Sequence, residues 1–168
     1  EILNTATAEE VDVVVLTGRA NSGYAFQSRN ELETLCERIP EGPFSQELMR
    51  WSGKGGLVAA GICEECDEGF YDSAAVFAKG EHVATYRKIH LYDNDVDWFL
   101  PGKDTPPVFE YMGCKFGVTL GYDWAFPELT RTLVLRGIQV LFHMTNLLLN
   151  YTPRAMISRS IENRIFVG

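Results

Sequence analysis

The sequence predicts an α/β fold whose sheet is largely covered by helices. Short apolar runs with the length and β-branched composition of strands alternate along the chain with segments of helical periodicity. Several of these runs are apolar at successive positions, which is typical of strands that are packed on both faces. No internal repeat, linker or low-complexity tract interrupts the sequence, so residues 1–168 are expected to form one continuous domain.

The first elements follow from local signals. Val11–Leu16 is rich in valine and predicts a strand buried on both faces, which the turn signal Thr17-Gly18 ends. Helical spacing predicts a helix from about Ser28 to Arg38, ended by Pro40. A second helix is expected over Pro43–Trp51, because its apolar residues recur on one helical face.

The middle of the chain predicts three successive antiparallel strands joined by tight turns. These strands are expected at Gly56–Cys63, Tyr71–Ala78 and His82–Lys88. Further strands are expected at Val108–Tyr111, Phe116–Leu120 and Gln139–Phe142, and helices at Phe126–Leu135, with Pro127 at the first turn, and at Arg154–Arg164.

The composition argues against several classes of protein. The chain has 168 residues, 46% of them hydrophobic and 23% charged, as in ordinary globular proteins, and this argues against disorder. Its 15 Lys+Arg against 23 Asp+Glu give a net charge of −8, without the basic excess that nucleic acids and anionic membranes attract. We therefore expect neither a nucleic-acid nor a membrane partner, and a cytoplasmic location, because no signal peptide is visible.

The four cysteines are irregularly spaced and do not form a metal-binding pattern. Cys63-Glu-Glu-Cys66 stands alone, whereas zinc sites need a second pair of ligands at matching spacing. A redox pair would be expected at a helix N-terminus, but this pair closes a predicted strand. Free thiols in a reducing compartment are the favoured interpretation.

Chemistry in such folds is expected just beyond the carboxyl ends of strands. Lys88 is the most suggestive residue there, because a buried ammonium can stabilise an oxyanion or act as a base. The alternative is that Lys88 reaches solvent or pairs with Asp93 or Asp95. His90 and His143 are expected to be structural, since no Ser-His-Asp pattern organises them.

Three segments resemble the motifs of the nitrilase (carbon–nitrogen hydrolase) superfamily. Tyr86-Arg-Lys-Ile-His-Leu91, followed by Trp98-Phe-Leu-Pro-Gly102, is similar to its lysine motif. Gly117-Val-Thr-Leu-Gly-Tyr-Asp-Trp124 resembles its nucleophile segment, and Asn21-Ser-Gly-Tyr24 the tail of its glutamate motif. Supporting matches are Phe126-Pro-Glu128, Tyr71-Asp-Ser-Ala74, Thr132–Gly137, His143-Met-Thr-Asn-Leu147, Arg154-Ala-Met156 and Glu162-Asn-Arg164.

The resemblance implies a four-layer α-β-β-α sandwich and a cysteine–glutamate–lysine site that hydrolyses small amides, carbamoyl compounds or nitriles. In that family the thiolate attacks the substrate carbon, the glutamate is the general base and the lysine stabilises the oxyanion. No metal or organic cofactor is implied, and homo-oligomers are expected by analogy. The positions implied to contact substrate are Tyr24, Tyr122, Asp123, Trp124 and Asn146.

The chain departs from the family pattern at two of the three catalytic positions. Lys88 matches the lysine, but Gly18 stands at the glutamate position and Gly121 at the cysteine position. Asp95 occupies a second acidic position that is usually glutamate. Cys114 lies seven positions before Gly121 on the same predicted strand, about 23 Å away, and cannot replace the nucleophile.

These substitutions leave two hypotheses, which are an inactive carbon–nitrogen hydrolase and a non-catalytic homologue that binds a small molecule or serves assembly. Under both hypotheses, the length of the chain has to be compared with that of the family's domain. Measured against the family's domain, the chain is expected to be partial, without an opening strand and the C-terminal third, and both of its ends are expected to be cut.

Overall fold

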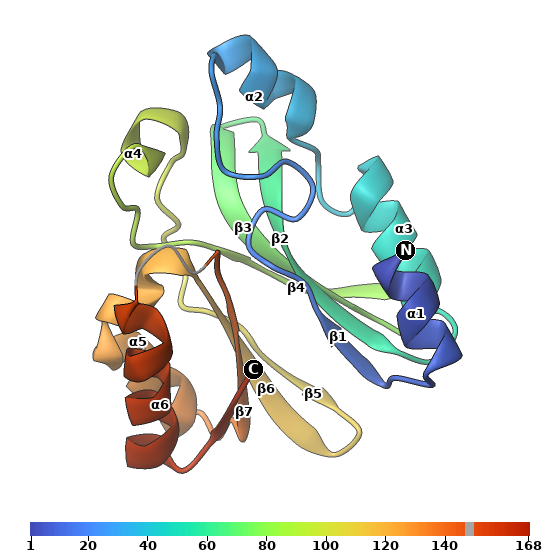
Figure 1. Cartoon of the computed structure of the whole chain (residues 1–168), viewed down its shortest axis with the longest axis vertical. Coiled ribbons are helices and arrows are strands. Elements are labelled where there is room, and N and C mark those ends of the chain that lie inside the picture. The colour runs from blue at the N-terminus through green and yellow to red at the C-terminus, as the bar shows by residue number, and fades with distance from the viewer. Residues whose placement is uncertain (147–149) are drawn as a thin grey trace.

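The chain folds into a four-layer α-β-β-α sandwich in which two sheets face one another and helices cover both outer faces (Figure 1). The computed structural model describes residues 1–146 and 150–168. The helices α1 and α3 lie on one side, and α5 and α6 on the other. This is the architecture that the resemblance implied.

The predicted elements appear in the expected order, and the structure adds two short helices, a 3₁₀ turn and a short strand that the sequence patterns did not predict. The helices are α1 (Ile2–Ala8), α2 (Arg29–Leu35), α3 (Pro43–Ser52), α4 (Asp95–Trp98), α5 (Pro127–Leu135) and α6 (Tyr151–Asn163), and a 3₁₀ turn, η1, spans Gly121–Ala125. The strands are β1 (Val13–Val15), β2 (Leu57–Cys66), β3 (Gly69–Ala78), β4 (Glu81–Arg87), β5 (Val108–Tyr111), β6 (Cys114–Leu120), β7 (Val140–Met144) and β8 (Phe166–Val167).

Each sheet has four strands in sequential order. In the first, β1 pairs with β2 in parallel, and β2, β3 and β4 form the predicted antiparallel meander. In the second, β5 and β6 form a hairpin, and β6, β7 and β8 are parallel. The segment after β4, which contains α4, and the turn η1 after β6 lie at the same end of the sandwich (Figure 1).

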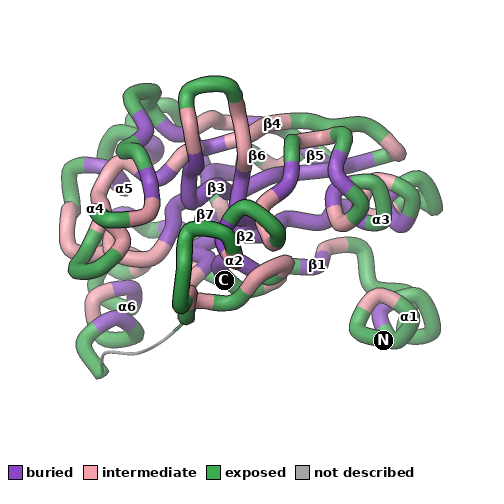
Figure 2. The backbone as a smooth tube through the Cα atoms, turned by 90° about the horizontal axis from the view of Figure 1, so that it is seen from above, coloured by how far each residue is buried: buried purple, intermediate pink, exposed green. Residues whose placement is uncertain are grey.

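Three apolar clusters hold the four layers together, and the strands are the most deeply buried part of the chain (Figure 2). Between the sheets, fully buried Ala59 and Val76 face Val118 of the second sheet. Outside the first sheet lies Leu48 of α3, and outside the second lies Leu133 of α5. The apolar strand runs of the sequence therefore reflect burial on both faces, as predicted for the central strands.

The expectation for the first strand was wrong in its length and in its burial. The strand β1 is shorter than Val11–Leu16, and only its Val14 is buried, while Val15 is 36% exposed. The reason is its position, because β1 is the outer strand of its sheet and has a single neighbour, β2.

The helix expected over Ser28–Arg38 also ends early. It begins at the predicted place, where the Ser28 hydroxyl accepts a hydrogen bond from the backbone N–H of Glu31. It stops at Leu35 because Cys36 turns extended and Glu37 then bridges to Glu64 of β2. Pairing with a strand therefore overrides the helical periodicity.

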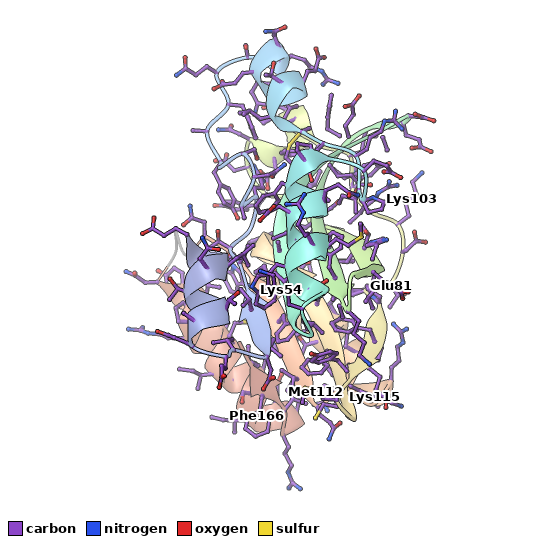
Figure 3. All side chains as sticks on the ribbon, turned by 90° about the vertical axis from the view of Figure 1, so that its right-hand side faces the viewer. Lys54, Glu81, Lys103, Met112, Lys115 and Phe166 are labelled. Atoms are coloured by element: carbon purple, nitrogen blue, oxygen red, sulfur yellow. A yellow bond between two sulfur atoms is a disulfide. The ribbon has the colours of Figure 1, made fainter. Side chains whose placement is uncertain are left out.

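The expectation of four free thiols is contradicted. Cys36 and Cys63 form a disulfide across a sequence separation of 27 residues, visible as a yellow bond in Figure 3. The early end of α2 brings the two cysteines together. Cys66 and Cys114 are free thiols. The bridge uses Cys63 but not Cys66, because Cys66 lies at the end of β2 and hydrogen-bonds to Glu68.

No helix within residues 1–146 and 150–168 is long and apolar enough to cross a membrane. Nor do three or more His, Cys, Asp or Glu side chains gather there in a way that could hold a metal ion.

Candidate active site

Lys88 directly follows the carboxyl end of β4, where strand β3 and the loop at Gly102 hold its backbone. Its N–H donates to the carbonyl of Asp72 on β3 at 2.8 Å, and its carbonyl accepts from Gly102 at 2.8 Å. The side chain is buried, with only 2% of its surface exposed. The strand therefore directs Lys88 into the protein, and the alternative of a lysine that reaches solvent is wrong.

The Lys88 ammonium pairs with two carboxylates. Its Nζ lies 2.6 Å from Asp95 Oδ2, one of the partners expected from the sequence, and 2.5 Å from Asp72 Oδ2. The other expected partner, Asp93, is exposed and makes no such pair within the described residues. A lysine ammonium has three protons, so one donor remains after these two contacts.

Arg19 and Asp72 belong to the same cluster, and sequence reasoning assigned neither a role. The Arg19 guanidinium donates to Asp72 Oδ2 at 3.1 Å and also to Asp95. It is stacked between aromatic rings, 4.5 Å from the ring centres of both Tyr24 and Phe99. Two cations and two carboxylates thus form a network whose formal charges cancel.

A signal for these two residues was present in the sequence. Asp72 interrupts the predicted strand Tyr71–Ala78, and Arg19 follows the turn Thr17-Gly18 that ends the first predicted strand. Charged side chains in such positions become buried only when they are paired. The pairing itself could not be predicted, because β1, β3 and α4 are far apart in sequence.

The pKa values in this network follow from burial and charge. Burial alone would raise the pKa of Asp95, but the charges and hydrogen bonds of Lys88 and Arg19 outweigh it and hold that pKa below its ordinary value. Burial likewise opposes the charge of Arg19, and Asp72 and Asp95 together raise its pKa. The pair of Arg19 and Asp95 is therefore fully charged at neutral pH.

A cavity of about 330 Å³ opens beside Lys88. Most of the predicted site residues line it, namely Lys88, Asp95, Gly121, Tyr24, Tyr122, Trp124 and Asn146, and it also contacts Tyr92, Asp93, Asn94, Thr145 and Thr152. The rings of Tyr92 and Tyr122 lie 4.5 Å apart. The cavity is large enough for a small ligand, with aromatic walls and charged groups along one side.

Gly121 forms the part of the cavity wall next to Lys88. It begins η1 in the left-handed region, with φ +45°, at the turn that follows β6. A Cβ placed there would lie 3.4 Å from Lys88 Nζ, in ordinary contact distance. A side chain at residue 121 would therefore project toward the ammonium, and glycine leaves that space open.

Gly18 is enclosed by other parts of the protein and does not line the cavity. A Cβ placed on it would lie 2.1 Å from the hydroxyl oxygen of Tyr24, closer than real Cβ atoms approach. On the other side, a Cβ on Gly61 of β2 would lie 2.4 Å from Gly18 Cα. The Tyr24 hydroxyl thus occupies the space into which a residue-18 side chain would extend.

The expectation that Asp123 contacts substrate was wrong, because Asp123 does not line the cavity. Its side chain is fully buried and accepts hydrogen bonds from the Tyr86 hydroxyl (2.8 Å), from the Leu120 backbone N–H (3.0 Å) and from His90 Nδ1 (2.8 Å). With its oxygens so engaged, Asp123 joins the segment that carries Lys88 to the turn that carries Gly121. Its role in the structure is to position these two segments.

The histidines have the structural environments expected from the sequence. His90 stacks on Phe126 with ring centres 3.6 Å apart, in addition to its contact with Asp123. His143 is buried, and its Nδ1 lies 2.9 Å from the hydroxyl of Thr119 on β6. Leu147, the last residue of the motif that begins at His143, lies outside the described residues.

The comparison with protein families decides the classification. The sequence profile of the carbon-nitrogen hydrolase family matches residues 1–168. The chain belongs to this family. The match spans the segments that build the cavity around Lys88.

Several relatives within the family have named activities. The chain is 35% identical over 167 residues to a nitrilase of Pyrococcus abyssi, covering 99% of this chain and 64% of that protein. It is 31% identical to an omega-amidase of Danio rerio, covering 99% of this chain and 64% of the relative. With an N-carbamoylputrescine amidase of Solanum lycopersicum it shares 30% identity, covering 98% of this chain and 60% of the relative.

Solved structures show the same fold. An amidase of Nesterenkonia sp. superposes with a TM-score of 0.79 at 22% identity, covering 98% of this chain and 64% of that one. The chain thus spans a little under two thirds of the length of the relatives that it matches.

Proposed function

We propose that the cavity beside Lys88 is the substrate pocket of a carbon–nitrogen hydrolase, suited to a small amide, carbamoyl compound or nitrile, and that this chain does not hydrolyse its ligand. One observation carries the proposal. Gly121, at the family's nucleophile position, opens directly onto Lys88 Nζ and supplies no thiol. Without a nucleophile no thioester can form, and residue 18 does not supply the carboxylate that serves as general base in the family.

The relatives support the substrate class. Their names describe a nitrilase, an omega-amidase and an N-carbamoylputrescine amidase, all of which act on carbon–nitrogen bonds of small molecules. For the Nesterenkonia amidase, a structure shows acrylamide added to its active-site cysteine. Cys114 cannot take over that part here, because it lies at the start of β6 while Gly121 follows the end of that strand.

The test is an assay of ammonia release with ω-amides, N-carbamoyl amino acids and aliphatic nitriles. Release from the chain should not exceed the rate in buffer, because the covalent pathway lacks its first step. The Lys88→Met variant is the matched control. Ammonia release that exceeds background and disappears in Lys88→Met would show hydrolysis at this site and overturn the proposal.

An assembly role is the second candidate, and it includes the expectation of a homo-oligomer. It is supported by large apolar side chains on the outer surface, which are costly to leave in water. Ile157 and Ile161 of α6 are 59% and 72% exposed, and Phe166 of β8 is 77% exposed. The cytoplasmic location also stays a prediction, and the Cys36–Cys63 disulfide weighs against it, because disulfides are rare in reducing compartments.

A further inference from the structure

Tyr24 gives the cavity a hydrogen-bond donor at the place where the family has a carboxylate. Its hydroxyl oxygen lies 2.1 Å from the Cβ position of residue 18, so it fills the space that a glutamate would enter. Arg19 packs against the Tyr24 ring and is itself held by Asp72 and Asp95. Tyr24 lines the same cavity as Lys88, and its contact with Arg19 holds its ring in position.

The Tyr24 phenol keeps its proton at neutral pH. The pKa of Tyr24 is raised to about 12, chiefly by burial and then by the negative charge of Asp72. The positive charge of Arg19 lowers this pKa by a smaller amount. The protonated phenol can therefore donate a hydrogen bond to a ligand.

Lys88 offers a second donor to the same space. Two of its three protons are used by Asp72 and Asp95, and the opening at Gly121 leads to within 3.4 Å of Nζ. A buried donor gains most from a charged acceptor. Each oxygen of Asp95 accepts a hydrogen bond from a cation, Arg19 or Lys88, and these two cations offset its negative charge toward an acidic ligand.

We propose that the pocket binds a small aliphatic carboxylate in preference to the corresponding amide, with Tyr24 and Lys88 as the two donors to its oxygens. This inference rests on the proposed function, because it places the ligand in the same cavity. The loss of the residue-18 carboxylate removes both an acceptor for an amide N–H and a negative charge that would repel an acid. The aromatic side chains of Tyr122 and Trp124 are placed to contact the ligand's aliphatic chain.

Calorimetric titration of the chain with sodium butyrate and with butyramide at pH 7 tests this preference, because the two probes share shape and chain length. Butyrate should bind about tenfold more tightly than butyramide, since charge-assisted hydrogen bonds are roughly twice as strong as neutral ones. The Tyr24→Phe variant should lose most of this ratio while its thermal unfolding stays cooperative. The control Tyr92→Phe, a tyrosine of the same cavity that is 49% exposed, should keep the ratio.

Three results would overturn the inference. These are equal or tighter binding of butyramide, an unchanged ratio in Tyr24→Phe, and no binding of butyrate at the highest soluble concentration. Ammonia is measured in the same butyramide samples. Its release would contradict the proposed absence of hydrolysis, whereas a preference for butyramide without ammonia release would contradict only the carboxylate preference.

Discussion

At the scale of single residues, the glycines at the two proposed catalytic positions, 18 and 121, differ in the space that surrounds them. Gly121 leaves open space next to Lys88, whereas the space of a residue-18 side chain is filled by the Tyr24 hydroxyl. Restoring a nucleophile at residue 121 therefore requires a side chain in the left-handed region but no repacking. Restoring the base at residue 18 also requires Tyr24 to move.

The overlap at residue 18 predicts a measurable coupling. Gly18→Ala should lower the free energy of unfolding by about 1–3 kcal/mol, because its Cβ would overlap the Tyr24 hydroxyl in a closely packed region. In a Tyr24→Phe background the oxygen is gone, and the cost of Gly18→Ala should fall by at least about 1 kcal/mol. Urea denaturation of the four variants of this cycle measures the coupling. Equal costs in both backgrounds would contradict the overlap.

At the scale of elements, the site depends on how the segment after β4 is joined to the turn after β6. Neither strand fixes the other directly, since they belong to different sheets. Asp123 of η1 makes this connection through Tyr86 of β4, the backbone of Leu120 and His90. A buried carboxylate with three donors holds Lys88 and Gly121 in one relative position.

Removal of this connection should destabilise the fold. Asp123→Ala leaves the buried Tyr86 hydroxyl and two further donors without their acceptor, and we expect a loss of about 3 kcal/mol in the free energy of unfolding. Asp123→Asn keeps one acceptor oxygen and should cost less. Chemical denaturation measures both. The exposed Asp97 of α4 serves as the control, and Asp97→Ala should change stability by no more than about 0.5 kcal/mol; similar effects of the two alanine substitutions would contradict the role of Asp123.

At the scale of the whole molecule, global stability depends on pH through a buried histidine. Burial lowers the pKa of His143 to about 4, although the charge of Asp123 acts in the opposite direction. In the unfolded chain the same group has its ordinary pKa near 6.5. The unfolded state therefore binds more protons between these two values, and acid favours unfolding.

The sign and size of this effect can be measured. The stability that neutral His143 contributes is fully present above about pH 6.5 and is lost as the pH falls through about 4, with a total of roughly 3 kcal/mol. His143→Gln should flatten this part of the pH profile of the free energy of unfolding. The exposed His82 provides the control, and His82→Gln should leave the profile unchanged. Parallel profiles for wild type and His143→Gln would contradict the assignment.

Much of the fold was predictable because its elements are encoded locally. The strands of the meander and α3 and α5 appear within a few residues of their expected ends, since turn signals and apolar periodicity mark them. The predictions failed where contacts with residues distant in sequence determine the burial or the end of an element. Val15 is exposed on β1, which is the edge strand of its sheet, and the end of α2 depends on Cys63 and Glu64 of β2.

The same division holds for the site. The sequence alone determined that residues 18 and 121 are glycines, because residue identity is independent of folding, and its resemblance to the family predicts that they stand at the glutamate and cysteine positions. Only the tertiary structure decided what surrounds them. The pairing of Lys88 with Asp72, the position of the Tyr24 hydroxyl at residue 18 and the burial of Asp123 away from the cavity all arise from contacts between different elements. Such contacts depend on the packing of two sheets and their loops, which no local pattern specifies.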